Sequence, residues 1–167
     1  MPPCLPPARD QRPTLVLDLD ETLVHSQLRP SPLSTHQQII NYENRTLVVH
    51  VHVRPFARKF LQHVAELFEV IVFTASQEIY AGDLLDWLDP EGHIQHRLYR
   101  QHCQCLDNTY VKDLRCLGRP LERTIIVDNN PLAFALQVEN GLPVSSWYDD
   151  PEDSELLGVL RVLRRLA

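Results

Sequence analysis

Two aspartates separated by a single residue are the strongest chemical signal in this sequence. Asp18 and Asp20 lie in the run DLDET at residues 18–22, within and just after an apolar, partly β-branched stretch. A third carboxylate, Asp128, follows another such stretch. Carboxylates gathered around one centre form a hard oxygen site, which suits Mg²⁺. We therefore expect these acids to hold a magnesium ion, and that ion would supply the local cation that an acidic protein needs to bind phosphate.

A parallel sheet would bring these side chains together. Three short apolar segments are predicted as buried strands, namely Thr14–Leu19, Glu69–Phe73 and Thr124–Val127. They deliver the Asp18/Asp20 pair, Thr74 and Asp128 to their carboxyl ends. Ligands of open α/β sheets bind beyond those ends. A lone acid there is more often a solvated loop residue or a helix cap, but polar residues after all three strands favour a shared site.

An insertion follows the first strand. From Leu47 apolar and polar residues alternate, which indicates a strand, and a weaker strand at Gln38–Tyr42 would precede it through a turn at residues 43–45. The two strands form a predicted β-hairpin. His50 and His52 fall on the same face of the second strand, and we expect that face to be exposed.

The remaining segments predict helices between strands. Helices are expected after Pro55 and at residues 77–88, Pro131–Leu136 and Ser154–Leu166, and short strands at His96–Arg100 and Leu142–Val144. This alternation implies an α/β fold, with a central, mostly parallel sheet and helices on both faces.

Length and composition indicate one folded domain. The chain has 167 residues, close to the size of a single domain of about 150. Its 44% hydrophobic and 23% charged residues exclude a wholly disordered chain. Five of the first 13 residues are proline, so we expect a poorly ordered lead-in over residues 1–13 and a single domain at residues 14–167.

Charge and residue usage exclude several classes of protein. The net charge of −6 argues against non-specific nucleic-acid binding, which needs a basic surface. The apolar runs are far shorter than the roughly 18 residues of a membrane span, and the first residues lack the apolar core of a signal peptide. The four cysteines form no C-x-x-C pair, which indicates a reduced, intracellular protein and not a disulfide scaffold.

The run DLDETLVHS at residues 18–26 resembles the signature of the small C-terminal-domain (CTD) phosphatases, a branch of the haloacid dehalogenase superfamily. Further matching segments follow in order: Arg54-Pro55, residues 73–76, Tyr80-Ala81, residues 110–114, 117–119 and 126–129, and Asn140-Gly141. The resemblance spans about residues 14–166. Within the branch, the sequence is most similar to the small-phosphatase-like proteins. Residues 97–103 are also similar to the nuclear-envelope phosphatase of the same branch. It implies a haloacid dehalogenase-like fold and a Mg²⁺-dependent phosphoprotein phosphatase, a phosphoric monoester hydrolase.

The resemblance also implies roles for single residues. Asp18 would attack phosphorus to form an aspartyl-phosphate, and Asp20 would serve as general acid for the leaving serine and then as general base for water. The residues implied to bind the phosphoryl group are Thr74 and Lys112, and those implied to bind Mg²⁺ are Asp18, Asp20 through its carbonyl, Asp128 and Asn129. Asn130 stands where the branch usually has serine, so we expect a tuned site.

A hydrophobic pocket formed by the insertion binds a proline beside the phosphoserine in this branch. The corresponding residues are Leu28, Ile40, Tyr42, Val49 and Tyr80, all apolar or aromatic, as a groove for polyproline II requires. Gln77 replaces an apolar residue of that pocket, and these side chains have the alternative role of packing the hairpin. Arg100 matches a position near the substrate, with a surface ion pair as its alternative.

The resemblance leaves three functions open. The expected substrate is phosphoserine in the C-terminal repeat of RNA polymerase II. The alternatives are a nuclear-envelope-type phosphatase acting on a lipid-metabolism regulator, for which we expect a membrane segment that this sequence lacks, and a non-catalytic binding module, which would have lost the first acids. We expect a monomer that binds a phosphorylated protein and makes no direct contact with nucleic acid. Nuclear location is implied by the resemblance alone.

The cysteines are not expected to take part in the chemistry. None is followed by arginine six positions later, which excludes the cysteine-nucleophile phosphatases. The spacing of Cys103 and Cys105 and the nearby histidines matches no usual zinc site.

Overall fold

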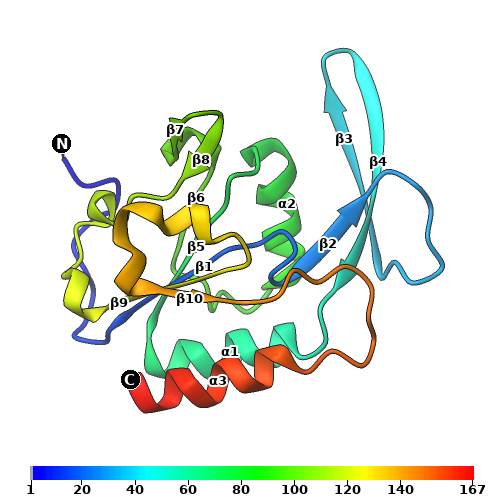
Figure 1. Ribbon diagram of the computed structural model, residues 1–167. Coiled ribbons are helices and arrows are strands. Elements are labelled where there is room, and N and C mark those ends of the chain that lie inside the picture. The colour runs from blue at the N-terminus through cyan, green and yellow to red at the C-terminus, as the bar shows by residue number, and fades with distance from the viewer. Residues whose placement is uncertain (1) are drawn as a thin grey trace.

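The computed structural model of the protein describes residues 2–167, and a five-stranded sheet lies at its centre (Figure 1). The strand order is β10-β9-β1-β5-β6, and all neighbours are parallel. The strands are β1 (Thr14–Leu17), β5 (Glu69–Phe73), β6 (His96–Leu98), β9 (Thr124–Asp128) and β10 (Gly141–Pro143). The three segments predicted as buried strands are the three central strands, because a strand covered on both faces needs a nearly continuous apolar run.

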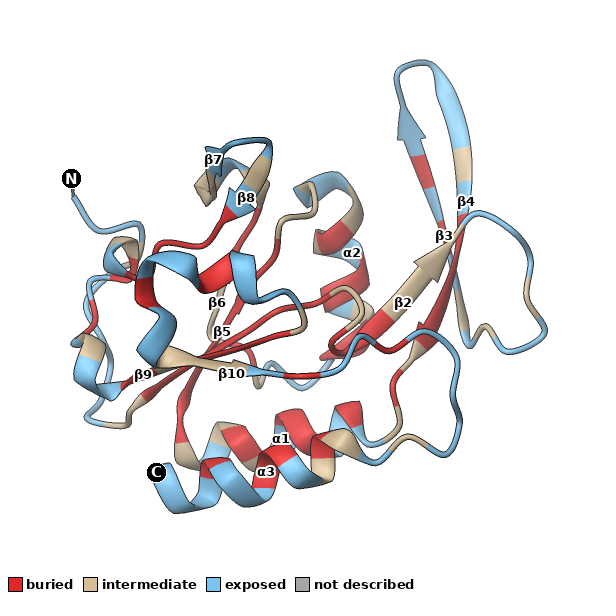
Figure 2. Ribbon diagram, in the orientation of Figure 1, coloured by how far each residue is buried: buried red, intermediate tan, exposed pale blue. Residues whose placement is uncertain are grey.

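Successive residues of the central strands face two separate cores. Leu15 and Leu17 of β1 belong to a large cluster that includes side chains of all three α-helices, whereas Val16 belongs to a smaller cluster beneath short 3₁₀-helices. The α-helices are α1 (Ala57–Leu67), α2 (Glu78–Leu88) and α3 (Glu155–Leu166). The 3₁₀-helices are η1 (Arg100–His102), η2 (Leu114–Leu117), η3 (Leu121–Arg123) and η4 (Pro131–Asn140). Figure 2 shows the buried residues along the central strands and on one side of α1 and α3, so the predicted layered α/β architecture is confirmed.

A second, antiparallel sheet follows β1 and extends away from the central sheet (Figure 1). Its order is β2-β4-β3, with β2 (Val24–Gln27), β3 (His36–Tyr42) and β4 (Arg45–Val53). Glu43 and Asn44 have φ angles of 47° and 60°, as a tight hairpin turn requires. The predicted hairpin insertion is therefore confirmed. We did not predict β2, because its mixed side chains hide the alternation and it is defined by pairing with β4.

The burial of His50 and His52 contradicts the exposed face that we expected. Their exposed fractions are 6% and 4%. The connection between β10 and α3 crosses this face, where the Tyr148 carbonyl oxygen lies 3.2 Å from His52 Nδ1. The Tyr148 ring in turn packs edge-on against His25 of β2, with ring centroids 5.0 Å apart. Alternation separates the two faces of a strand, but a segment distant in the sequence decides which face is covered.

A second small hairpin was also absent from the sequence prediction. It consists of β7 (Gln104–Leu106) and β8 (Thr109–Val111), joined by Asp107 and Asn108 with φ angles of 47° and 61°. An Asp-Asn pair is a recognised signal for such a turn, but the flanking strands are only three residues long. This hairpin matters because β8 leads directly into Lys112.

The first residues lie against the domain without forming a helix or strand. Within residues 2–13, the Pro6 carbonyl accepts a hydrogen bond from Arg119 Nη1 (3.0 Å) and the Cys4 amide donates to the Cys116 carbonyl (2.6 Å). Poor order of this segment stays a prediction. In the described part of the chain, no helix has the length and apolar character needed to cross a bilayer.

Arg54 connects the turn after β1 to the start of α3. Its guanidinium is buried, and it donates to the carboxylates of Asp153 (2.7 Å) and Glu155 (3.2 Å). It also donates to the carbonyls of Thr22 and Ser145 at 3.2 and 3.1 Å. One buried cation thus holds the ends of three segments that are far apart in the sequence.

We expect Arg54→Met to lower the free energy of unfolding by about 3–5 kcal/mol, because it leaves two carboxylates and two carbonyls without their donor. Arg54 also lowers the pKa of Asp153 by hydrogen bonding to its carboxylate. A lowered folded-state pKa stabilises the protein above the ordinary aspartate value near 4, and that contribution is lost as the pH falls through the folded value.

Urea unfolding at about pH 7 and about pH 3 checks both statements. The difference between wild type and Arg54→Met should shrink at the lower pH. The exposed Arg45→Met is the matched control and should change stability by less than ~0.5 kcal/mol. An equal loss at both pH values would contradict the charge contribution.

Candidate active site

Three adjacent strands bring polar side chains to one edge of the central sheet. Asp18 follows β1, Thr74 follows β5, and Asp128 ends β9, and all three are at most 6% exposed. They border a cavity of about 270 Å³. Its lining residues are Asp18, Asp20, Glu21, Thr74, Ala75, Ser76, Arg100, Tyr110, Lys112, Asp128, Asn129, Asn130 and Ala133. The convergence expected at the carboxyl ends of the strands is therefore present.

Lys112 lies between two of the aspartates. Its Nζ donates to Asp18 Oδ1 at 2.7 Å and to Asp128 Oδ2 at 2.6 Å, and its side chain is 2% exposed. The short β7–β8 hairpin and a bond from the Lys112 amide to the Ala133 carbonyl (2.7 Å) place it there. Burial lowers the pKa of Lys112, but the two carboxylates more than offset this effect and raise its pKa. Lys112 is therefore a permanent cation in the cavity and not a surface lysine.

The second oxygens of both aspartates face Asn129. Thr22 Oγ1 donates to Asp18 Oδ2 at 2.8 Å. The side-chain amide of Asn129 lies 2.9 Å from Asp18 Oδ2 and 3.3 Å from Asp128 Oδ1. The Asn129 amide can take two orientations. When its oxygen faces the carboxylates, that oxygen, Asp18 Oδ2 and Asp128 Oδ1 converge with no proton between them. When the amide is reversed, its NH₂ group donates to both carboxylates. The three converging oxygens lie on the side of the carboxylates that Lys112 does not contact, and they fit a small oxygen-seeking cation.

The charge of this cluster also favours a cation. Lys112 balances only one of the two carboxylates that it contacts. Burial, with a contribution from the charge of Asp18, raises the pKa of Asp128 above its ordinary value despite the opposing effect of Lys112. Within residues 2–167 no group of three His, Cys, Asp or Glu side chains is placed to hold a metal ion, so the ligands would be two carboxylates together with amide and carbonyl oxygens, as Mg²⁺ accepts.

Asp20 has a different environment from Asp18. It is partly exposed, its Oδ2 accepts a hydrogen bond from Ser76 Oγ at 2.5 Å, and its Oδ1 accepts one from Tyr80 OH at 2.7 Å. Burial of the carboxylate raises the pKa of Asp20 to about 6, although these two hydrogen bonds act in the opposite direction. A carboxyl group that can hold a proton near neutral pH has the property required of a general acid.

Thr74 and Arg100 stand on the opposite side of the cavity. Thr74 Oγ1 accepts a hydrogen bond from the Ser76 amide (3.0 Å), so it shapes the turn before α2, whose N-cap is Gln77. Arg100 donates through Nε to the Ala75 carbonyl at 2.7 Å, and its guanidinium stacks on the Tyr110 ring at 4.9 Å. The Nε contact and the stacking orient the guanidinium at the cavity, so the structure gives Arg100 these neighbours in place of the surface ion pair.

Of the five residues expected to bind a substrate proline, three share one face of the β2-β4-β3 sheet, while Leu28 follows β2 and Tyr80 lies on α2. None of the five lines the cavity. The pairing register places Ile40, Tyr42 and Val49 on the face that carries Ser26, which contacts Tyr80 of α2. Ile40 and Val49 are buried in the main core, whereas Leu28 and Tyr42 are 61% and 40% exposed. Packing the hairpin is therefore one role of the buried pair, and proline binding stays a prediction.

Several cavity residues were missed by the sequence analysis. Ser76, Glu21 and Tyr110 stand inside matched segments, next to residues that we selected, so the motifs contained the signal for them. Ser146 had no such signal. It lies in the β10–α3 connection and reaches the site only because the fold places its hydroxyl 2.8 Å from the Asn129 amide.

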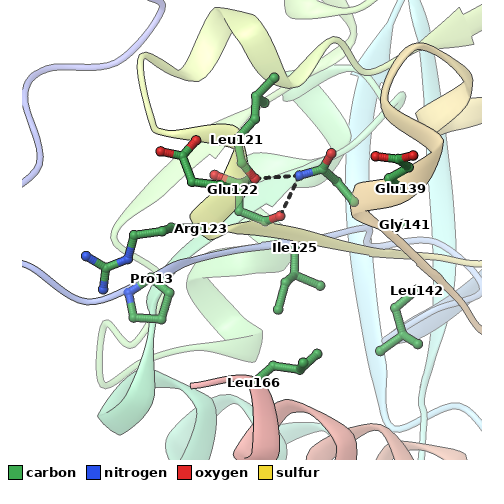
Figure 3. Close-up of a pocket in the computed structure, with 11 residues that line it drawn as sticks. Pro13, Leu121, Glu122, Arg123, Ile125, Glu139, Gly141, Leu142 and Leu166 are labelled. Carbon is green, nitrogen blue, oxygen red and sulfur yellow. Dashed lines mark hydrogen bonds between the residues drawn. The ribbon is translucent and has the colours of Figure 1, made fainter.

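A larger cavity of about 620 Å³ lies at the other end of the sheet (Figure 3). Pro13, Ile125, Leu142 and Leu166 form an apolar part of its lining near the amino ends of β1 and β9. The side-chain amide of Asn140, which also lines this cavity, donates to the carbonyls of Leu121 and Thr124. Because no reactive groups converge there, the smaller cavity is the candidate active site.

The family model described as NLI interacting factor-like phosphatase matches residues 13–167. This chain belongs to that family. The family membership confirms the resemblance recognised from the motifs, and the chain's relatives are named as phosphatases, which is the enzyme class that we predicted.

Relatives with curated names match nearly the whole chain. CTD small phosphatase-like protein 3 of Caenorhabditis elegans is 47% identical over 98% of this chain and 58% of its own length. CTD small phosphatase-like protein 2 of Dictyostelium discoideum is 45% identical over 100% of this chain and 30% of its own length. The human carboxy-terminal domain RNA polymerase II polypeptide A small phosphatase 2 is 42% identical over 92% and 56%. The chain thus spans about a third to three fifths of the length of these relatives.

Solved structures confirm the fold class. The structure of Fcp1, described as an essential RNA polymerase II CTD phosphatase, superposes with a TM-score of 0.71 over 93% of this chain and 51% of that one, at 20% identity. A fission yeast Fcp1 structure with beryllium fluoride bound gives a TM-score of 0.70 at 18% identity, over 93% of this chain and 50% of that one. At this identity the likeness concerns the fold, which is haloacid dehalogenase-like α/β.

Proposed function

We propose that the protein is a Mg²⁺-dependent protein serine/threonine phosphatase that works through an aspartyl-phosphate on Asp18. The observation that carries the proposal is the contrast between two carboxylates two residues apart. Asp18 is fixed by Lys112 and Thr22 beside the cation-binding oxygens, while Asp20 is held separately by hydroxyl groups. One carboxylate is placed to attack and the other to transfer a proton.

The first step forms a bond between an Asp18 oxygen and phosphorus as the bond from phosphorus to the serine oxygen breaks. The Asp20 proton passes to that serine oxygen, so the leaving group departs as a neutral alcohol. Lys112 and Arg100 reduce the repulsion between the carboxylate and the phosphoryl dianion. In the second step Asp20 accepts a proton from water, whose oxygen attacks phosphorus and releases Asp18. When bound by Asp18, Asp128, Asn129 and the Asp20 carbonyl, Mg²⁺ would neutralise further phosphoryl charge.

The proposed substrate is phosphoserine in the C-terminal repeat of RNA polymerase II. The names of the relatives support this choice. The apolar side chains of the insertion also support it, because together with Tyr80 of α2 they would bind a proline next to the phosphoserine. The retained Asp18, Asp20 and Lys112 argue against a non-catalytic binding module. The nuclear-envelope alternative and nuclear location stay predictions.

Metal removal tests the proposal. We expect EDTA to lower the release of p-nitrophenol from its phosphate ester roughly 10³-fold at mildly acidic pH, and added Mg²⁺ to restore it. Magnesium should also raise the melting temperature of wild type but not of Asp128→Asn, because a ligand stabilises only the state that binds it.

Activity on phosphoserine-proline peptides would then support the substrate assignment. A folded wild-type protein that is inert toward both substrates would contradict the enzyme proposal and favour a binding module. Activity that EDTA leaves unchanged would contradict the metal dependence alone.

A further inference from the structure

A chain of hydroxyl groups reaches the candidate general acid from outside the cavity. Tyr80, in the first turn of α2, contacts Asp20 Oδ1 through its OH at 2.7 Å. The Tyr80 hydroxyl oxygen also lies 2.5 Å from Ser26 Oγ on β2. Figure 1 shows α2 beside β2, which brings these groups together from segments more than 50 residues apart in the sequence. Neither Tyr80 nor Ser26 belongs to the cavity lining, so neither contacts the phosphoryl group there.

The direction of these hydrogen bonds follows from the charges. A phenol carries one proton, and Asp20 Oδ1 can only accept, both in the ionised carboxylate and when Oδ2 holds the proton for the leaving group, so Tyr80 donates to Asp20. The Tyr80 oxygen is then free to accept, and Ser26 donates to it. A tyrosine hydroxyl ordinarily keeps its proton at neutral pH, so Tyr80 acts as the donor. The order is therefore Ser26 to Tyr80 to Asp20.

We infer that Tyr80 is a positioning residue for the general acid, supported by Ser26, and not only a wall of the substrate groove. This inference rests on the proposed function. The backbone around Asp20 is already constrained, because the Glu21 amide bonds to the Val24 carbonyl (2.7 Å). The direction of the Asp20 carboxyl group, however, depends on its hydroxyl partners. Tyr80 holds Oδ1 from outside the cavity, while Oδ2 contacts Ser76, which lines the cavity.

The effect should appear when Asp20 gives up its proton. As the serine oxygen leaves phosphorus and takes the proton from Asp20, a negative charge develops on the Asp20 carboxyl group. The Tyr80 hydroxyl stabilises that charge because it is already oriented toward it, at no cost in reorganisation. A leaving group that departs as a stable anion needs no proton, so its departure does not use this stabilisation.

Two substrates therefore separate this role from a purely structural one. Serine must be protonated as it leaves, whereas p-nitrophenolate is stable as an anion. We expect Tyr80→Phe, which keeps the ring, to lower kcat/KM for a phosphoserine peptide roughly 10- to 100-fold, the loss of one hydrogen bond to a charged group. For p-nitrophenyl phosphate the change should stay within about twofold. The ratio kcat/KM is used because it covers the steps up to leaving-group departure and omits hydrolysis of the aspartyl-phosphate.

Controls locate the effect in the hydroxyl chain. Tyr148→Phe removes a half-exposed hydroxyl that has no hydrogen-bond partner among residues 2–167. It should leave kcat/KM unchanged for both substrates. Ser26→Ala should lower phosphoserine turnover less than Tyr80→Phe does. The double variant should be no slower than Tyr80→Phe, because Ser26 acts through Tyr80.

An equal loss with both substrates, or no loss, would overturn the positioning role while the proposed function stood. An additive double variant would overturn the order Ser26 to Tyr80 to Asp20. Wild type that is inert toward both substrates would overturn the proposed function and this inference with it, and that result is visible before any variant is compared.

Discussion

Replacing Asp18 with asparagine is expected to reduce kcat for p-nitrophenyl phosphate by roughly 10⁴-fold or more, the scale seen when a catalytic nucleophile is removed. An amide oxygen cannot act as the nucleophile, because the carboxylate charge that attacks phosphorus is gone. The variant keeps the shape of the side chain. Its oxygen can still face Lys112, and its NH₂ group can donate to Thr22 Oγ1 in place of Asp18 Oδ2.

The activity loss should therefore occur in a folded protein. Thermal unfolding checks this, and the exposed Asp83→Asn on α2 is a control that makes the same chemical change away from the site. In wild type quenched during turnover, mass spectrometry should find one added phosphoryl group on the peptide that contains Asp18. Phosphoryl transfer that persists in Asp18→Asn would assign the nucleophile to another residue.

Replacing Lys112 with methionine is expected to remove both activity and much of the stability. Asp18 and Asp128 would be left as neighbouring buried acids without the cation that lies 2.7 and 2.6 Å from them. Breaking a buried ion pair by removing one partner costs about 3–5 kcal/mol. For a domain of this size that lowers the melting temperature by about 10 °C. The loss of a charge facing the phosphoryl group should lower kcat by roughly 10³-fold.

A second substitution separates the two effects of Lys112. Adding Asp128→Asn to Lys112→Met removes one of the two uncompensated carboxylates, so we expect most of the stability to return while activity stays absent. The exposed Lys59→Met on α1 should change neither property. A Lys112→Met protein as stable as wild type would show that the buried charges are compensated by another group.

Many features of the site were predictable from local patterns. Asp18 and Asp128 could be placed because apolar runs of four or five residues end there, and parallel strands present their carboxyl ends at one edge. The hairpin insertion was predictable from alternation at residues 47–53. The short β7–β8 hairpin was not, because three-residue strands give too little periodicity, although it carries Lys112 into the cavity.

The roles of Tyr80, His52 and Ser146 depended on contacts that local patterns do not contain. Tyr80 was expected only in an apolar pocket, yet its hydroxyl reaches Asp20 because α2 packs beside β2. The β10–α3 connection covers His52 on the antiparallel sheet and also brings Ser146 to Asn129. Such contacts join residues 17 to 96 positions apart, and no periodicity specifies them.

The α/β class, the three buried strands, the candidate reactive carboxylates and the family could all be predicted before the structure was known. These properties follow from residue type, short-range periodicity and ordered motifs, which folding does not alter. The distribution of charge among those carboxylates, in contrast, depends on contacts that form when the chain folds. Lys112 bridges Asp18 and Asp128 and balances one of their two charges, while Ser76 and Tyr80 hold Asp20 apart. Because desolvation and hydrogen bonding depend on position in space, two aspartates of one motif acquire different environments only once the chain has folded.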